Sequence, residues 1–210
     1  MTFANARAAG GPLLGRVEPV PTPVWLTWQA ALVETGDEST SLSAQGALSL
    51  YAMLVQRHIR CWVAGGWGVD ALLGRETRPH HDLDLLVSLD DLGELQDLLA
   101  EQGFSRKLVW EENRWVDVRG ARTPTAFVEV DSLGRELDIH VIQRVQGGPP
   151  IALYDRAWEF PDDSLEGVGT ISGVAVTCIS TVTQLQAHTG YDLPPLHQSD
   201  VDQLRLLADE

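Results

Sequence analysis

The stretch at residues 61–87, CWVAGGWGVDALLGRETRPHHDLDLLV, carries two adjacent glycines and, further along, two aspartates inside an apolar run. CWVAG is typical of a short buried strand, and the segment after it predicts a short helix that begins at the turn formed by Gly65 and Gly66. HDLDLLV then predicts a second strand. Because side chains at positions i and i+2 of a strand project from the same face, Asp82 and Asp84 should point together.

A pair of aspartates on one strand face needs a physical reason. Two carboxylates that are so close repel each other unless a cation or a shared proton lies between them. On a strand with one wet face both acids would simply meet water, but the apolar residues around Asp82 and Asp84 and the preceding Gly-Gly turn disfavour that alternative. Oxygen ligands on a rigid strand suit Mg²⁺, which completes its coordination with water and substrate phosphates. A third acid should come from a neighbouring strand, and Asp138 in ELDIHVI offers one.

The composition narrows the class of protein. A chain of 210 residues with 44% hydrophobic residues is sufficient for one globular domain and a small appendage. Its net charge of −15 argues against a nucleic-acid backbone as partner, and it serves either solubility or the attraction of a small cationic substrate. No apolar run reaches about 18 residues and no signal peptide is recognisable, so we expect no membrane span and a cytoplasmic location. Cys61 and Cys178 lie in apolar segments, where free core thiols are expected.

The order of predicted elements indicates an α/β domain with a mixed sheet and a small helical C-terminal part. Residues 41–60 predict a helix, and residues 88–103 predict another, with Ser88 as its N-cap and Gly103 just after its end. Strands follow up to about residue 145. The last 40 or so residues predict a hairpin that turns at Ser172 and Gly173, followed by two helices. The residues expected to cap those helices are Ser180 and Ser199.

The N-terminal segment differs in composition from the rest of the chain. Residues 1–40 are rich in proline and glycine, yet they contain Trp25 and Trp28. Because two tryptophans are seldom left in an exposed tail, we expect this segment to pack against the body of the protein.

These motifs together resemble a known family. GGW, a helix, LLGRETRPHHDLDLLV and, some fifty residues later, ELDIHVI are similar to the small O-nucleotidyltransferases that modify aminoglycoside and lincosamide antibiotics, in the polymerase-β-like superfamily. VAVTCIS and QLQAHTGYD near the C-terminus are similar, more loosely, to lincosamide-type members. The resemblance implies a polymerase-β-like nucleotidyltransferase core of α/β (α+β) class at residues 41–145. Residues 146–210 would then form a C-terminal hairpin and helices that complete the acceptor side.

The resemblance also implies roles for individual residues. Asp82 and Asp84 match the family's metal-binding aspartates, and Asp138 matches its third carboxylate, a general base that is often a metal ligand as well. The residues that match the nucleotide-binding positions are Gly65, Gly66, Trp67, Arg75, Arg78 and His80. The basic residues also have simpler interpretations: Arg78 and His80 as loop residues, and Arg75 as a charge favoured at a helix C-terminus.

The pattern alone predicts the placement of other polar residues in this region. Asp70 is expected on the exposed face of its helix. Glu129 is expected either to line the acceptor pocket or to face water. His140, two residues after Asp138 on the same strand face, either borders the site or has no part in it.

The implied function is the Mg²⁺-dependent transfer of a nucleoside monophosphate from a nucleoside triphosphate, expected to be ATP, to a hydroxyl of a small acceptor. Two Mg²⁺ ions are expected. The surplus of acids favours a cationic, aminoglycoside-type acceptor. The acids expected on strands that flank Asp138 are Glu111, Glu112, Glu129 and Asp131. A lincosamide, another metabolite or a protein target as in toxin-type relatives remain alternatives, as does a non-catalytic nucleotide-binding module.

Overall fold

The computed structural model describes residues 15–17, 41–110, 113–117, 119–144, 150–152, 158–189 and 192–208. The helices are α1 (Ala44–Gln56), α2 (Gly65–Leu73), the 3₁₀ helix η3 (Leu89–Asp91), α3 (Leu92–Glu101), α4 (Thr181–Ala187) and α5 (Pro195–Ala208). The strands of the large sheet are β2 (Cys61–Val63), β3 (Asp82–Ser88), β4 (Ser105–Val109), β7 (Ala126–Val130), β8 (Glu136–Arg144), β9 (Pro150–Ala152), β10 (Trp158–Glu159), β11 (Gly167–Ile171) and β12 (Val174–Cys178). A separate small sheet contains β1 (Gly15–Val17), β5 (Arg114–Asp117) and β6 (Arg122–Pro124).

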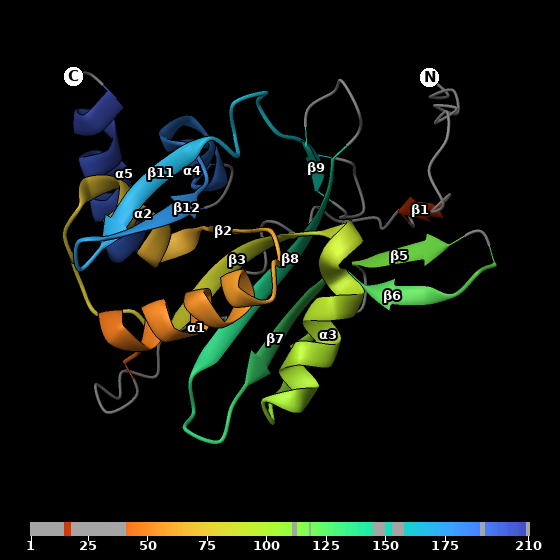
Figure 1. Ribbon diagram of the computed structural model, residues 1–210. Coiled ribbons are helices and arrows are strands. Elements are labelled where there is room, and N and C mark those ends of the chain that lie inside the picture. Colours follow the sequence, from red (N-terminus) through yellow and green to blue (C-terminus); the bar gives the residue numbers. More distant parts are fainter. Residues whose placement is uncertain are drawn as a thin grey trace, which may run out of the picture.

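The large sheet is mixed, as the sequence predicts (Figure 1). Its main path runs β10-β9-β8-β3-β2-β12-β11, and β7 pairs with both β8 and β4. The central pair, β3 and β8, is parallel, as is the pair of β12 and β2, whereas β2 and β3 are antiparallel. The strands that carry the predicted carboxylates therefore lie side by side in the middle of the sheet.

Two apolar clusters lie on the two faces of this sheet. The larger one is covered by α1 and α3, which pack on the same face (Figure 1). Its strand residues include Leu83, Leu85, Leu137 and Ile139, all fully buried. The smaller cluster belongs to the opposite face, which also carries the aspartates of β3. Its larger members are Trp62, Leu86, Trp110, Ile142, Phe160 and Leu165.

Local signals explain most of the helix ends. The side chains of Ser43 and Ser180 accept hydrogen bonds from the amides of Gly46 and Thr183 and so cap α1 and α4. Gly103, just after α3, has a positive φ of 76°, which glycine adopts without strain. Ser88 precedes η3 without a capping side-chain bond, so the expected capped α-helix starts one short turn later.

The predicted start of the last helix was wrong. Ser199 lies inside α5, which already begins at Pro195. Proline suits the first turn of a helix because that position needs no amide hydrogen and proline already has a helical φ. The sequence SDVDQL resembles a capped start, but the proline four residues earlier determines the boundary.

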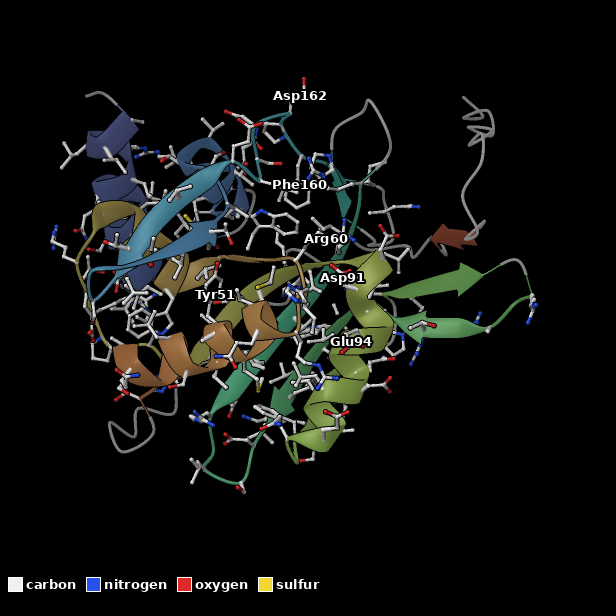
Figure 2. All side chains as sticks on the ribbon, viewed as in Figure 1. Tyr51, Arg60, Asp91, Glu94, Phe160 and Asp162 are labelled. Carbon is white, nitrogen blue, oxygen red and sulfur yellow. The ribbon has the colours of Figure 1, made fainter. Side chains whose placement is uncertain are left out.

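Polar contacts tie the helices to the sheet. The hydroxyl groups of Tyr51 on α1 and Thr177 on β12 lie 2.8 Å apart. Arg60, just before β2, forms an ion pair of 2.8 Å with Asp91 of η3 (Figure 2). Cys61 and Cys178 are buried free thiols, which confirms the prediction.

Only a small part of the N-terminal segment is described. Gly15–Val17 forms β1, which pairs antiparallel with β5. Trp25 and Trp28 lie outside the described residues, so the predicted packing of residues 1–40 through these side chains stays a prediction. Among the residues that the structure describes, no helix is long and apolar enough to cross a membrane.

Candidate active site

The three predicted carboxylates come together on β3 and β8. Asp84 lies directly opposite Asp138 across the parallel pair, and Asp82 lies opposite Glu136 in the same register. One ligand atom each from Asp84, Asp138 and His140 lies within 4.8 Å of the others, a separation that a single cation could bridge. The prediction that Asp138 comes from the neighbouring strand, on the same face as the two aspartates of β3, is confirmed.

The carboxylates are held where their negative charge is costly. Burial, followed by the charges of Asp138 and Glu136, raises the pKa of Asp82 to about 7. Burial and the same kind of like-charge contact raise the pKa of Asp84 well above its ordinary value. The positive charge of Arg78 partly offsets both shifts. A cation bound between these carboxylates would relieve the repulsion.

The surroundings of the Asp138 carboxylate also suit the binding of a cation. Its side chain is fully buried, and neither carboxylate oxygen accepts a hydrogen bond within the described part of the chain. Nε2 of His140 lies 3.0 Å from Oδ1 of Asp138, close enough for an ion pair but without the alignment of a hydrogen bond. Buried carboxylate oxygens without donors are hard ligands for a divalent cation such as Mg²⁺, so these residues fit the implied metal.

The Gly-Gly turn lies against these carboxylates. Gly65 begins α2 with a positive φ of 54°, and a methyl group at this position would overlap the Asp84 carboxylate. A methyl group at Gly66 would overlap the imidazole of His80. Only glycine therefore lets the backbone come so close to the site. Ala64, at the N-cap of α2, supplies no side-chain cap, which suits amide groups that are to bind an anion.

The side chains of Trp67 and His80 pack against each other next to the Gly65–Gly66 turn. The Trp67 side chain is buried, with its ring centroid 4.7 Å from that of His80, so only its backbone amide is suited to meet a nucleotide. Nε2 of His80 lies 2.6 Å from Oδ2 of Asp70. The other oxygen of Asp70 accepts hydrogen bonds from the amide and hydroxyl of Thr77. The expectation that Asp70 is exposed was therefore wrong: it is buried, because it holds the segment before β3.

The two predicted arginines have different surroundings. Arg78 is largely buried and forms an ion pair of 2.9 Å with Asp200 of α5, so the simple interpretation as a solvated loop residue does not hold. Its Nη2 lies 3.1 Å from the position of a methyl group built on Gly66. Arg75 is exposed, and its Nη2 donates a 2.6 Å hydrogen bond to Gln203 of α5. Of the two, Arg78 is thus the one placed against the Gly-Gly turn.

Glu129 lies on β7, which flanks β8 as expected, but its side chain is placed differently from the prediction. Glu129 lies opposite Leu137 in the β7–β8 pair, on the face away from Asp138, and forms an ion pair with Arg106. It therefore neither lines the site nor simply faces water. Asp131 forms an ion pair with Arg135, which lowers its pKa, and Glu111 and Glu112 lie outside the described residues.

Other residues of the site were missed by sequence reasoning. Glu136 has the same strand parity as Asp138 and could have been found from that alternation. Gln184 and Asp200 approach the Gly-Gly turn from helices more than 100 residues away, and no local signal points to them.

The chain matches known proteins over most of its length. The model of the aminoglycoside-2''-adenylyltransferase family matches residues 47–204. A lincosamide resistance protein from Staphylococcus haemolyticus is 24% identical over 148 residues, which cover 70% of this chain and 84% of that protein. A 2''-aminoglycoside nucleotidyltransferase from Escherichia coli is 42% identical over 48 residues, which cover 23% of this chain and only 27% of that protein.

Solved structures show the same fold. The lincosamide antibiotic adenylyltransferase LnuA, solved with lincomycin bound, superposes with a TM-score of 0.66 at 22% identity and covers 79% of this chain and 98% of its own. ANT(2'')-Ia, in complex with adenylyl-2''-tobramycin, superposes with a TM-score of 0.59 at 23% identity and covers 79% and 90%. The predicted nucleotidyltransferase fold is confirmed. Since the matching model spans well over half of the chain, the protein is a nucleotidyltransferase of the aminoglycoside-2''-adenylyltransferase family.

Proposed function

We propose that this enzyme transfers a nucleoside monophosphate from ATP, in the presence of Mg²⁺, to a hydroxyl group of a small acceptor. One observation carries the proposal: Asp84 and Asp138 are direct neighbours on one sheet face, beside a turn whose two glycines leave no room for a side chain. Rigid carboxylates next to free backbone amides are what the transfer of a phosphate group between oxygens requires.

Each residue of the site has a separate role in the proposed transfer reaction. Asp82, Asp84 and Asp138 would hold two Mg²⁺ ions, which when bound would offset the triphosphate charge and lower the pKa of the acceptor hydroxyl. Asp138, whose oxygens accept no hydrogen bond from the residues that the structure describes, takes up the proton of that hydroxyl. The hydroxyl oxygen bonds to the α-phosphorus while the bond to the bridging oxygen breaks, and pyrophosphate leaves. The amides of Gly65, Gly66 and Trp67, together with Arg78, meet the charge of the leaving phosphates.

An aminoglycoside is the first candidate for the acceptor. The family description and the net charge of −15 support it, because aminoglycosides are polycations. Fewer individual acids near the site could attract a cationic acceptor than the sequence suggests. Glu129 faces away from Asp138, and Asp131 forms an ion pair with Arg135. Glu136 lies on the carboxylate face, but it too forms an ion pair, with Lys107.

A lincosamide is the second candidate, and a specific observation favours it. The sheet face that carries the carboxylates also carries a cluster of aromatic residues, Trp62, Trp110 and Phe160. The ring centroid of Trp110 lies 5.8 Å from that of His140, which in turn contacts Asp138. An acceptor with a more apolar body would suit an aromatic wall at this place.

Mass spectrometry separates these candidates. The protein is incubated with ATP, GTP, CTP or UTP, with Mg²⁺ or EDTA, and with tobramycin, lincomycin or a panel of hydroxylated metabolites. We expect a tobramycin adduct of one nucleoside monophosphate and release of pyrophosphate, both abolished by EDTA and by Asp84→Asn. Asp97→Asn on the exposed surface of α3 is the matched control and should leave turnover unchanged.

Each other result has a defined meaning. An adduct on lincomycin alone assigns the second candidate. An adduct on a metabolite or on a protein of the reaction mixture assigns the remaining acceptor classes. Binding of ATP without any adduct or pyrophosphate would indicate a non-catalytic module. The cytoplasmic location expected from the sequence stays a prediction.

A further inference from the structure

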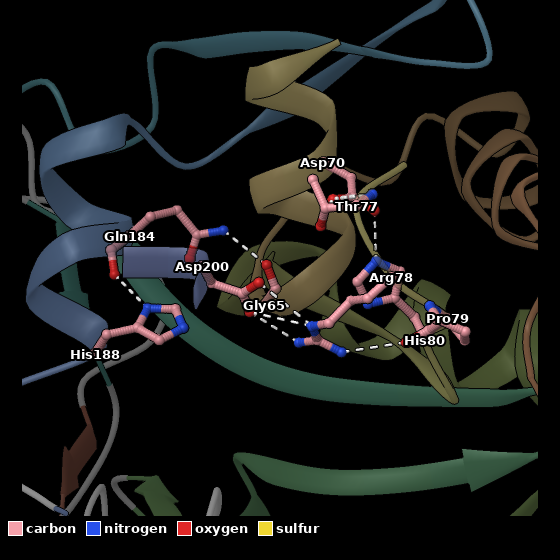
Figure 3. A network of polar contacts seen from close by, with 9 residues as sticks. All are labelled: Gly65, Asp70, Thr77, Arg78, Pro79, His80, Gln184, His188 and Asp200. Carbon is pink, nitrogen blue, oxygen red and sulfur yellow. Dashed lines mark hydrogen bonds and ion pairs between the residues drawn. The ribbon is translucent and has the colours of Figure 1, made fainter. Parts of the chain in front are cut away.

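The C-terminal helices contact the Gly-Gly turn and the segment before β3. Figure 3 shows Gln184 and His188 of α4 and Asp200 of α5 beside Gly65 and Arg78, with hydrogen bonds that link both helices to these residues. The proposed function uses the Gly-Gly turn and Arg78, but it assigns no part to the helices that hold them.

Gln184 holds the turn itself. Its buried Nε2 donates a 2.9 Å hydrogen bond to the carbonyl oxygen of Gly65, the residue with the positive φ. The backbone of Gly68, one turn further along α2, is so close that a methyl group there would overlap the same amide. Ser180 begins α4 with a capping bond, and His188 ends it with a 2.7 Å contact between Nδ1 and the carbonyl oxygen of Gln184. The amide that binds Gly65 therefore comes from a helix fixed at both ends.

Asp200 holds the guanidinium. Its carboxylate is almost fully buried and accepts hydrogen bonds from Nε of Arg78 at 3.3 Å and from Nη2 at 2.9 Å. Nη1 of Arg78 donates to the carbonyl oxygen of Pro79. A guanidinium has five N–H groups, so these contacts fix its plane and leave one N–H on each Nη atom for a ligand. Nη2 is the atom next to Gly66.

The buried amide of Gln184 and the buried ion pair of Asp200 with Arg78 stabilise the fold less than apolar side chains would. A buried ion pair seldom stabilises a fold more than apolar residues of similar size. Oε1 of Gln184 is buried without a hydrogen-bond partner in the described part of the chain, which costs free energy. A methionine or leucine would fill the same space without this cost, so the amide and the carboxylate are better explained by what they hold.

We propose that Gln184 and Asp200 are positioning residues for the nucleotide: the first fixes the Gly65–Gly66 turn, and the second fixes Arg78 beside it. The inference rests on the proposed function, because it takes these two features as the site of the triphosphate. It adds that the C-terminal helices set the affinity for the nucleotide, in addition to any contact with the acceptor.

Nucleotide affinity tests the inference directly. We compare Gln184→Met and Asp200→Asn with Gln186→Met and Asp202→Asn, matched changes at exposed positions of the same two helices. The dissociation constant of ATP with Mg²⁺ is measured by equilibrium dialysis, together with the melting temperature and both KM values. We expect nucleotide binding to weaken about tenfold in each of the first two variants, the scale of one hydrogen bond. In the two control variants the dissociation constant of ATP should stay within about twofold of the wild-type value. In all four variants the KM of the acceptor should also stay within about twofold.

A double-mutant cycle shows whether Asp200 acts through Arg78. In an Arg78→Met background, Asp200→Asn should weaken nucleotide binding no further. Asp200→Glu, which keeps the charge, should bind ATP more tightly than Asp200→Asn. A lower melting temperature with an unchanged dissociation constant in Gln184→Met and Asp200→Asn would overturn the inference. Wild-type protein that binds no nucleoside triphosphate would instead contradict the proposed function, which separates the two failures.

Discussion

The two faces of the β3–β8 pair share a backbone and a register but have opposite chemistry. On the face covered by α1 and α3, Leu85 of β3 lies opposite Ile139 of β8, and both are fully buried. On the other face, Asp84 lies opposite Asp138, one residue earlier on each strand. A shift of register by a single residue would exchange the two sets, because the side-chain period of a strand is two.

This difference shows how stability and chemistry are separated. The aliphatic face gains free energy from burial. On the acidic face, burial and neighbouring like charges raise the pKa of Asp82 and Asp84, and the oxygens of Asp138 accept no hydrogen bond from the described residues. The aliphatic side chains fix the strands, and the strands fix the carboxylates. Changes on one face should therefore affect stability and changes on the other should affect turnover.

The largest expected effect is the loss of turnover on the acidic face. Asp138→Asn keeps the size of the side chain but removes the proton acceptor and one carboxylate ligand, so we expect kcat/KM to fall by about 1,000-fold or more. The melting temperature of the metal-free protein should not fall, because the substitution removes a buried carboxylate whose charge raises the pKa of Asp82 and Asp84. Pyrophosphate release and thermal unfolding measure the two quantities. Turnover equal to that of wild type would contradict the role of Asp138.

The opposite face should respond in the opposite way. Leu85→Ala removes a fully buried side chain from the core between the sheet and α1, and we expect the free energy of unfolding to fall by about 2–5 kcal/mol. At a temperature where the variant is folded, the KM for the nucleotide should be unchanged within about twofold. Urea denaturation and initial rates provide the test. A large rise in KM without a loss of stability would show that the two faces are not independent.

The Gly-Gly turn joins the backbone to the acidic face, and its substitution should give an intermediate effect. Gly65→Ala introduces a methyl group into the space of the Asp84 carboxylate and imposes strain at a φ of 54°. We expect kcat/KM to fall by about 10–100-fold, the range for a displaced catalytic group.

Gly93→Ala in α3 is the matched control for this change. A methyl group built at Gly93 meets no atom within 4 Å, and alanine favours the helix by about 1 kcal/mol. This variant should be active and at least as stable as wild type. Equal activity in the two alanine variants would show that the close approach of the turn is not required.

The acidic face could be predicted because its signals are local. Asp82 and Asp84 are two residues apart, so their common face follows from strand geometry alone, and Asp138 occurs in an alternating strand of its own. The parallel pairing of β3 and β8 then brings the three together. The alternation of residues along each strand, together with the family resemblance of the motifs, was therefore sufficient to predict the three carboxylates of the site.

Other placements could not be predicted because they depend on register or on distant partners. The side of the sheet that Glu129 faces depends on its pairing with Leu137, and no residue near Glu129 reveals it. Asp70 is buried because Thr77 and His80 fold back onto it. Arg78 meets Asp200 across 122 positions of the chain, a separation at which sequence patterns carry no information about contact.

The last expected effect concerns the stability of the metal-free protein, and its sign follows from the raised pKa values. In the unfolded chain the Asp82 carboxyl titrates near 3.8, whereas in the folded protein burial and its acidic neighbours raise its pKa to about 7. Between these values the folded state holds a proton that the unfolded state has lost. The free energy of unfolding should therefore fall as pH rises through this window, and it should level off above about pH 7 for this group.

Two changes should reduce the dependence of the protein's stability on pH. Mg²⁺ at pH 8 should raise the melting temperature, because a bound cation compensates the charges, and each kcal/mol gained corresponds to about 2–4 °C for a chain of this size. Asp84→Asn, which removes a carboxyl whose own pKa is raised by burial and by Asp82 and Asp138, should flatten the profile without Mg²⁺, whereas Asp97→Asn should not. Melting curves from pH 5 to 8 with EDTA or Mg²⁺ measure both effects. A profile of equal slope in wild type and Asp84→Asn would mean that the acidic face costs no stability, and the contrast between the two faces would then rest on turnover alone.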